Sequence, residues 1–239
     1  MPKLKGQDLV LDVLTINTRA RALTGGSAGV PIVRRSAALI RDVDPSPMYR
    51  RHVTRVQYFT ACTLDGFIAD ENHSLDWLFD APHSEDDDAW DEFIGGVGPM
   101  VMGSSTYEWV LRRYDLLANP QQWHDFYADR PCWVFSHRDL PRIPTATVRI
   151  VSGDVRPVYE EMVTALPGKN IWIVGGGDLA GQFDDADLLD EVWLGMRPVF
   201  LGAGAPLLPR RITTRRVTLR EVRHAGQQLQ LILDVARHN

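Results

Sequence analysis

The chain has 239 residues, 44% of them hydrophobic, and a formal net charge of −5. That length allows one full-sized core with a modest appendage and is too short for two unrelated domains of ordinary size. The composition excludes disordered and collagen-like chains, and no apolar run approaches the roughly 18 residues of a membrane helix, so we expect no membrane contact.

Residues 1–52 differ from the remainder of the chain in charge and pattern. They hold nine Lys or Arg against four Asp or Glu, and no hydrophobic periodicity continues across their glycine break at 25–27. We therefore expect a flexible basic extension, or a mis-assigned start with Met48 as the true one; a short helix at 31–43 is the remaining alternative. Residues 53–239 should form the folded body, whose excess of acidic side chains argues against a nucleic-acid partner.

From residue 53 onward, short apolar runs alternate with helical stretches. This alternation predicts a mainly parallel sheet with helices on both faces. After residue 188 only strand-like runs follow, the last two joined at a hairpin, so the sheet should end in antiparallel strands. We expect strands at 53–63, 99–103, 132–136, 148–151, 170–174, 189–200, 216–224 and 227–236, and helices at 84–97, 104–113, 154–166 and 177–183.

The two cysteines, Cys62 and Cys132, lie in apolar, strand-like surroundings. There is no Cys-x-x-Cys pair or His cluster, which favours buried thiols over a metal site. The amino terminus also lacks the pattern of a secretory signal. We therefore expect a cytoplasmic protein without a bound metal.

A continuous apolar run at 171–174 leads directly into Gly175, Gly176 and Gly177, and a helix should begin near Asp178. Glycines at such a corner permit positive φ angles and let backbone N–H groups approach a ligand. At a helix N-terminus, those groups and the helix dipole favour a phosphate. The alternative is a tight turn selected for its geometry alone. A Rossmann site is rejected, because only antiparallel strands are expected downstream.

The glycine triplet is one of four motifs that follow one another along the chain: ACTLDGFIA at 61–69, VMGSSTYE at 101–108, VGGG at 174–177 and PVFLGAG at 198–204. The series resembles the dihydrofolate reductase-like superfamily, most closely the C-terminal reductase domain of the bifunctional riboflavin-biosynthesis deaminase-reductase. The resemblance implies an α/β, three-layer fold with a mainly parallel central sheet of about eight strands ending in antiparallel edge strands. It also implies NADPH as the cofactor, lying across the C-terminal ends of the central strands.

The same resemblance implies which residues hold the cofactor. Ser136 and Arg138 follow the strand at 132–136, where similar reductases bind the adenosine 2′-phosphate, and an arginine fork would favour NADPH over NADH. An ordinary solvated turn is the alternative there, and Arg142 is a rival ligand. The phosphates would be contacted at two helix starts, formed by Gly103, Ser104, Ser105 and Thr106 and by Val174, Gly175, Gly176, Gly177, Asp178 and Leu179.

Three carboxylates are candidates for catalysis. Asp65, in the turn after the first strand, could orient the carboxamide or the substrate, or could cap the turn. Dihydrofolate reductase uses a carboxyl group on the next helix to assist protonation. Helical periodicity places Asp86 on the apolar face of that helix, whereas the Asp-x-Ala-Trp pattern of dihydrofolate reductase favours Asp87. An acidic run at a helix start could also do no more than compensate the helix dipole.

The acceptor is expected to be a small molecule of the pyrimidine or pterin type. The zinc motif of the deaminase domain does not occur, so the resemblance implies at most the reduction of 5-amino-6-(5-phosphoribosylamino)uracil; dihydrofolate reductase activity and a non-catalytic NADPH-binding protein are the alternatives. Trp77 could cover the reacting ring or belong to the core. The C-terminal strands could pair subunits in a homodimer. Other candidates on the substrate side are Gly202 and Gly204, with Arg112, Arg113 and Arg197 for a substrate phosphate.

Overall fold

The computed structural model describes residues 54–80 and 88–238. The expected extension at 1–52, the alternative start at Met48 and the two carboxylates Asp86 and Asp87 lie outside the described residues.

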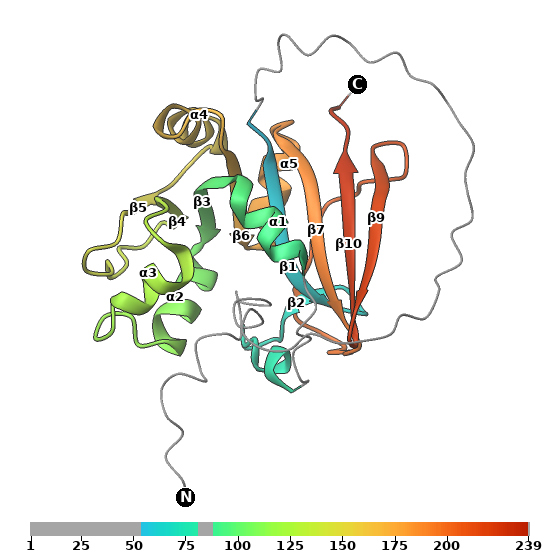
Figure 1. Cartoon of the computed structure of the whole chain (residues 1–239), viewed down its shortest axis with the longest axis horizontal. Helices are drawn as coiled ribbons and strands as arrows, with labels where there is room; N and C mark the ends of the chain where they lie inside the picture. Colours follow the sequence, from blue (N-terminus) through green and yellow to red (C-terminus); the bar gives the residue numbers. More distant parts are fainter. Residues whose placement is uncertain (1–53, 81–87, 239) are drawn as a thin grey trace, which may run out of the picture.

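The centre of the protein is a single eight-stranded sheet. It consists of β1 (Val56–Thr63), β3 (Val97–Gly103), β4 (Cys132–Phe135), β5 (Val148–Val151), β6 (Asn170–Gly175), β7 (Leu189–Arg197), β9 (Val217–Ala225) and β10 (Gln228–Val235). Their order is β5-β4-β3-β6-β1-β7-β10-β9 (Figure 1). The strands from β5 to β7 pair in parallel, whereas β10 pairs antiparallel with both β7 and β9. The predicted parallel sheet with antiparallel edge strands is thus confirmed.

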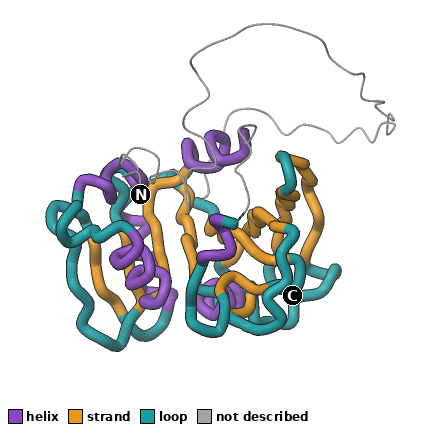
Figure 2. The backbone as a smooth tube through the Cα atoms, turned by 90° about the horizontal axis from the view of Figure 1, so that it is seen from below, coloured by secondary structure: helices purple, strands orange, loops and turns teal. Residues whose placement is uncertain are grey.

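Helices cover both faces of this sheet and complete the three layers (Figure 2). One face packs against α1 (Asp88–Gly96), α2 (Ser104–Arg113) and α3 (Gln121–Tyr127), and the other against α4 (Val155–Ala165) and α5 (Gly177–Asp185). A second small sheet pairs β2 (Phe67–Ala69) with β8 (Ala205–Pro206), and the short helix η1 (Asp76–Phe79) follows β2. In the described residues, no helix is long and apolar enough to cross a membrane.

Strand β6 shows why the sequence adopts this layered arrangement. Its apolar run is continuous because both faces of the strand are covered. Ile171 and Ile173 pack in the layer of α4 and α5, while Trp172 and Val174 pack in the layer of α1, α2 and α3. All four are buried, so β6 is a central strand that leads from the middle of the core to the sheet's C-terminal edge.

Several predicted boundaries differ from those of the structure. The strand expected at 189–200 ends at Arg197, because Pro198 has no N–H to continue the ladder. The helix expected at 84–97 is described only from Asp88 and ends at Gly96, since Val97 already belongs to β3. The sequence prediction also missed α3, η1 and the small β2–β8 sheet.

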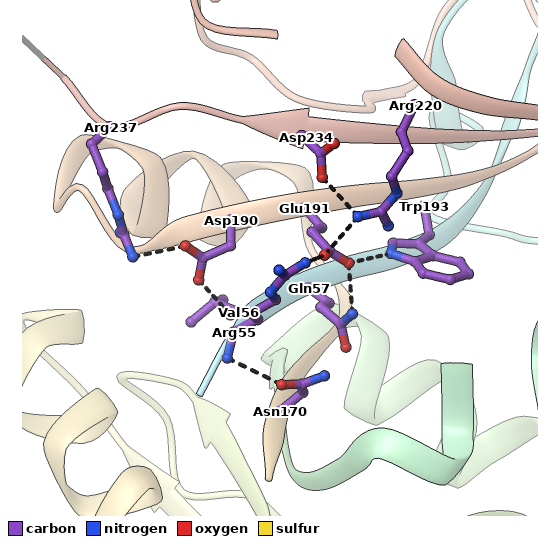
Figure 3. A network of polar contacts seen from close by, with 10 residues as sticks. All are labelled: Arg55, Val56, Gln57, Asn170, Asp190, Glu191, Trp193, Arg220, Asp234 and Arg237. Carbon is purple, nitrogen blue, oxygen red and sulfur yellow. Dashed lines mark hydrogen bonds and ion pairs between the residues drawn. The ribbon is translucent and has the colours of Figure 1, made fainter. Parts of the chain in front are cut away.

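A polar network around a buried carboxylate links β1, β7, β9 and β10 near the amino-terminal ends of β1 and β7 (Figure 3). Its centre is the carboxylate of Glu191, which accepts hydrogen bonds from Gln57 Nε2 at 2.7 Å and Trp193 Nε1 at 2.8 Å and pairs with Arg55 and Arg220. Burial raises the pKa of Glu191, but the bonds from Arg220, Gln57, Trp193 and Arg55 outweigh it and lower that pKa to about 2. The charge is therefore retained and fully engaged in holding the strands together.

Candidate cofactor and acceptor site

A cavity of about 300 Å³ lies at the C-terminal ends of β1 and β6. It brings together most of the residues expected to face the phosphates. Gly103, Ser104 and Leu179 adjoin these residues in the chain without lining the cavity. The expected residues that do line it are Ser105 and Thr106 at the start of α2, and Val174, Gly175, Gly176, Gly177 and Asp178 at the start of α5.

The starts of α2 and α5 approach each other closely. Their N-cap residues are Gly103 and Gly176, and neither helix start has a side chain that caps its amides. A Cβ placed on Gly176 would lie 3.6 Å from the backbone nitrogen of Gly103. By contrast, the start of α4 is capped, because Asp154 accepts a hydrogen bond from the Arg156 amide. The first-turn amides of α2 and α5 thus remain available to an anion such as a diphosphate.

The three glycines of the triplet are required for different reasons. Gly176 has φ +103°, a conformation that side chains other than glycine rarely adopt. A Cβ on Gly175 would lie 2.7 Å from Thr106 Oγ1, and a Cβ on Gly177 would lie 2.2 Å from the carbonyl oxygen of Pro206. Close packing therefore explains why positions 175 and 177 require glycine. Packing does not explain Gly176 in this way, so the cofactor interpretation depends most on that residue.

The turn expected to bind the 2′-phosphate is connected to the same helix start. Arg138 donates two hydrogen bonds to the carboxylate of Glu108 in α2, both at 2.9 Å, and a longer one to Ser104 Oγ. Ser136 Oγ accepts a bond from the Arg138 amide and donates one to the Arg138 carbonyl. Neither residue lines the cavity. Sequence reasoning did not foresee Glu108, which holds the exposed guanidinium beside the N-terminus of α2.

Asp65 does not line the cavity, and its carboxylate is engaged in hydrogen bonds. Its carboxylate accepts bonds from Thr63 Oγ1 and from the amides of Leu201, at 3.0 Å, and Gly202, at 2.7 Å. The bond from Thr63, followed by the two amides, lowers the pKa of Asp65. This geometry matches the turn-capping alternative: the carboxylate ties the turn after β1 to the loop before β8.

Replacing Asp65 with asparagine should therefore destabilise the protein and leave cofactor binding unchanged. The pKa of Asp65 is lower in the folded protein than in the unfolded chain, where it is about 4. The stabilisation of the fold by the ionised carboxylate is therefore fully present above about pH 4 and is lost as the pH falls through the folded-state pKa. The melting temperature of Asp65→Asn should be below that of the wild type at pH 7, and the gap should narrow below about pH 4. A gap that stays constant between pH 7 and pH 3 would contradict this role.

The residues expected on the substrate side do not line the cavity. Trp77 is buried but does not line it, while Leu75 and Leu78 on either side do. Gly202 contributes its amide to Asp65. A Cβ on Gly204 would lie 2.1 Å from the Ala69 carbonyl oxygen, so this glycine lets β8 pack against β2.

The three arginines proposed for a substrate phosphate do not line the cavity either. Arg112 is exposed at the end of α2, the guanidinium of Arg113 lies 4.4 Å from the ring centre of Phe79, and Arg197 is buried in β7.

Sequence reasoning missed the aromatic walls of the cavity. Phe59, Trp90, Trp109 and Trp172 line it from four different elements. Trp172 is fixed by a hydrogen bond from its Nε1 to the Phe59 carbonyl oxygen at 3.1 Å, and Trp90 stacks on Phe59. Walls of this kind suit a planar ring, which can stack on or pack edge-on against them.

The floor of the cavity is made of small residues. Ala61 of β1 pairs with Gly195 of β7, and both line the cavity. Two residues earlier on the same face of these strands, Phe59 of β1 pairs with Trp193 of β7, and both side chains are large and buried. The step from large to small side chains leaves space above the sheet beside the glycine turn.

Two titratable side chains among the described residues line the cavity, His73 and Asp178. Asp178 accepts a hydrogen bond from Gln182 and pairs with Arg210. The bond from Gln182, with a smaller contribution from Arg210, lowers the pKa of Asp178, so this carboxylate stays charged and is a poor proton donor. No group of three His, Cys, Asp or Glu residues that could hold a metal occurs in residues 54–80 and 88–238.

Comparison with known proteins relates this chain to a family of reductases. Residues 118–231 match the model of the RibD C-terminal domain. The uncharacterized protein YwjB of Bacillus subtilis (strain 168) is 31% identical over 178 residues, covering 72% of this chain and 93% of that protein. A second uncharacterized protein of the same organism, YyaP, is 28% identical over 167 residues, covering 67% of this chain and 85% of its own length.

Solved structures agree with the sequence matches. A putative riboflavin biosynthesis protein from Shewanella sp. PV-4 superposes with a TM-score of 0.61 at 25% identity, covering 77% of this chain and all of that one. A deaminase/5-amino-6-(5-phosphoribosylamino)uracil reductase from Thermotoga maritima shares the fold, with a TM-score of 0.52 at 15% identity over 77% of this chain and 57% of that one. From the matched sequences, the shared fold and the three-layer architecture, we conclude that the chain belongs to the family of the RibD C-terminal domain, a family of riboflavin-pathway reductases.

Proposed function

We propose that this protein is an NADPH-dependent reductase of the riboflavin-biosynthesis type, acting on a pyrimidine- or pterin-like acceptor. The observation that carries the proposal is the pair of uncapped helix starts at Gly103 and Gly176, which face each other beside a cavity with aromatic walls. Two anion sites in one parallel sheet suit a dinucleotide better than a single phosphate. Family membership supports the reaction class. When bound, NADPH would supply the hydride.

In this proposal the chain's residues hold the cofactor and exclude water from the acceptor. The backbone amides at the starts of α2 and α5, with the hydroxyls of Ser105 and Thr106, would bind the diphosphate. Phe59, Trp90 and Trp172 would keep the acceptor ring in an apolar environment, in which water competes poorly. The small residues of the floor leave room for the ring.

Arg138 would select NADPH over NADH. Its guanidinium is already oriented by Glu108, so it is held in place before a 2′-phosphate arrives. Replacing Arg138 with alanine should weaken NADPH binding about tenfold or more and change NADH binding far less. Titration calorimetry with both nucleotides would measure the two losses.

The matched control is Arg149→Ala. Arg149 is also half exposed and paired with a glutamate, Glu161, but it projects from β5 and does not line the cavity. This variant should bind both nucleotides as the wild type does. If Arg138→Ala loses as much affinity for NADH as for NADPH, Arg138 does not bind the 2′-phosphate. Arg142 would then be the next residue to test.

Turnover separates an enzyme from a binding protein on the same fold. NADPH oxidation should be followed with 5-amino-6-(5-phosphoribosylamino)uracil and, separately, with dihydrofolate as the acceptor. Oxidation with the aminouracil compound would support the riboflavin-type reaction, and oxidation with dihydrofolate alone would favour the second activity. Binding of NADPH without turnover of either acceptor would contradict the riboflavin-type assignment and support the non-catalytic alternative.

We also propose that the antiparallel end of the sheet pairs subunits in a homodimer. Leu219 and Val222 of β9 and Leu229 of β10 are exposed apolar side chains at this end. Light scattering should give twice the chain mass of 26.9 kDa, and Val222→Asp should shift the protein to the monomer mass. A monomeric wild type would refute the pairing.

A further inference from the structure

A buried polar strip continues from the floor of the cavity toward the edge of the sheet. Gln230 of β10 pairs with Gly195 of the floor, and Gln228 lies two residues before it, on the same face. Arg197, two residues after Gly195, pairs with Thr63 of β1 on that face. Gln228 is 4% exposed and Gln230 is 1% exposed. Polar side chains buried this deeply are costly unless their atoms find partners.

Among the described residues, the amide nitrogens of the two glutamines have no partner. Nε2 of Gln228 and Nε2 of Gln230 are buried and make no hydrogen bond within the described part of the chain. Nε2 of Gln228 also lies 3.0 Å from the position that a Cβ would take on Gly195, a residue that lines the cavity. The Gln228 amide therefore packs over Gly195 at the margin of the cavity, although neither glutamine lines the cavity itself. A ligand that brings hydrogen-bond acceptors to this place would satisfy both nitrogens.

We propose that Gln228 and Gln230 bind the polar edge of the acceptor heterocycle. The inference rests on the proposed function and extends it by naming the residues that would recognise the substrate through hydrogen bonds. A side-chain amide presents one donor group and one acceptor oxygen, which suits the adjacent carbonyl and N–H of a uracil or pterin ring. The aromatic walls provide stacking but no hydrogen-bonding selectivity, so these amides supply the discrimination between rings.

The stability of the free protein gives the first test. In Gln228→Met and Gln230→Met, an unpartnered buried amide is replaced by an apolar side chain of similar length, which should raise the melting temperature by about 2 °C or more. The matched control is Gln227→Met, since Gln227 is exposed in the same hairpin and should change little. A lower melting temperature in both buried variants would show that the amides are structural and would overturn the proposal.

Ligand binding gives the second test. The probes are 5,6-diaminouracil and folic acid, titrated calorimetrically into the full chain saturated with NADP⁺. The wild type and Gln227→Met should bind at least one probe, and Gln228→Met and Gln230→Met should bind it about tenfold or more weakly. NADPH stabilisation should be equal in all four proteins. Unchanged probe binding in the buried variants, or no binding of either probe to the wild type, would overturn the proposal. Failure of the proposed function itself is distinguishable, because NADPH would then not stabilise the wild type.

Discussion

Replacing Gly176 with valine should abolish NADPH binding. Its φ of +103° is strained for any side chain, and a Cβ there would lie 3.4 Å from Leu179 Cβ and 3.6 Å from the Gly103 nitrogen. The two methyl groups of valine would then extend into the space between the helix starts of α2 and α5. NADPH at saturating concentration should raise the melting temperature of the wild type by several degrees and that of Gly176→Val not at all.

The backbone strain of this variant needs its own control. Gly153, before α4, has φ +92°, and no described atom lies within 4 Å of the position that a Cβ would take there. Gly153→Val therefore introduces similar strain in open space. Both variants should melt below the wild type, but Gly153→Val should keep the full NADPH shift. If Gly176→Val binds NADPH with wild-type affinity, the glycine turn does not bind the phosphates.

Neutralising the carboxylate that we propose assists protonation should lower turnover more than any other single substitution. Asp87→Asn or Asp86→Asn should lower kcat by about 10²- to 10⁴-fold, the usual contribution of general acid catalysis. Asp178 cannot readily replace the lost proton donor, because its hydrogen bonds lower its pKa and keep it charged. Trp90, which lines the cavity, follows Asp87 by three residues. Steady-state kinetics on the two separate variants would identify the responsible residue.

The matched control for these variants is Asp80→Asn, an exposed carboxylate at the end of η1 that does not line the cavity. It should keep wild-type turnover, and all three variants should bind NADPH equally. Full turnover in both Asp86→Asn and Asp87→Asn would eliminate the carboxylate hypothesis and make His73, the other titratable residue of the cavity wall, the next candidate.

The sheet could be predicted from sequence because each buried strand carries a local signal. The apolar run at 171–174 and the alternation of strands with helical stretches were sufficient to predict a parallel sheet, and the predicted hairpin before Gln228 gave its antiparallel end. The β2–β8 sheet has no comparable signal, since strands of two and three residues show no periodicity. Its pairing depends on the close approach of Gly204 to Ala69.

The site was only partly predictable for a related reason. The glycine turn and the start of α2 follow strands directly, so their place at the sheet edge can be deduced from sequence order. The bonds of Asp65 to Leu201 and Gly202 and of Arg138 to Glu108 join segments far apart in the chain. No single-sequence pattern encodes such pairings.

The most direct test of the cofactor site is a thermal-shift comparison of the wild-type chain with NADPH, with NADH and without nucleotide. At 100 times its dissociation constant, NADPH should stabilise the fold by about 2.7 kcal/mol, which is a rise of roughly 5 °C or more. NADH at the same concentration should give a smaller rise. An unchanged melting temperature with NADPH would contradict the cofactor site at Gly103 and Gly176 and, with it, the proposed reductase.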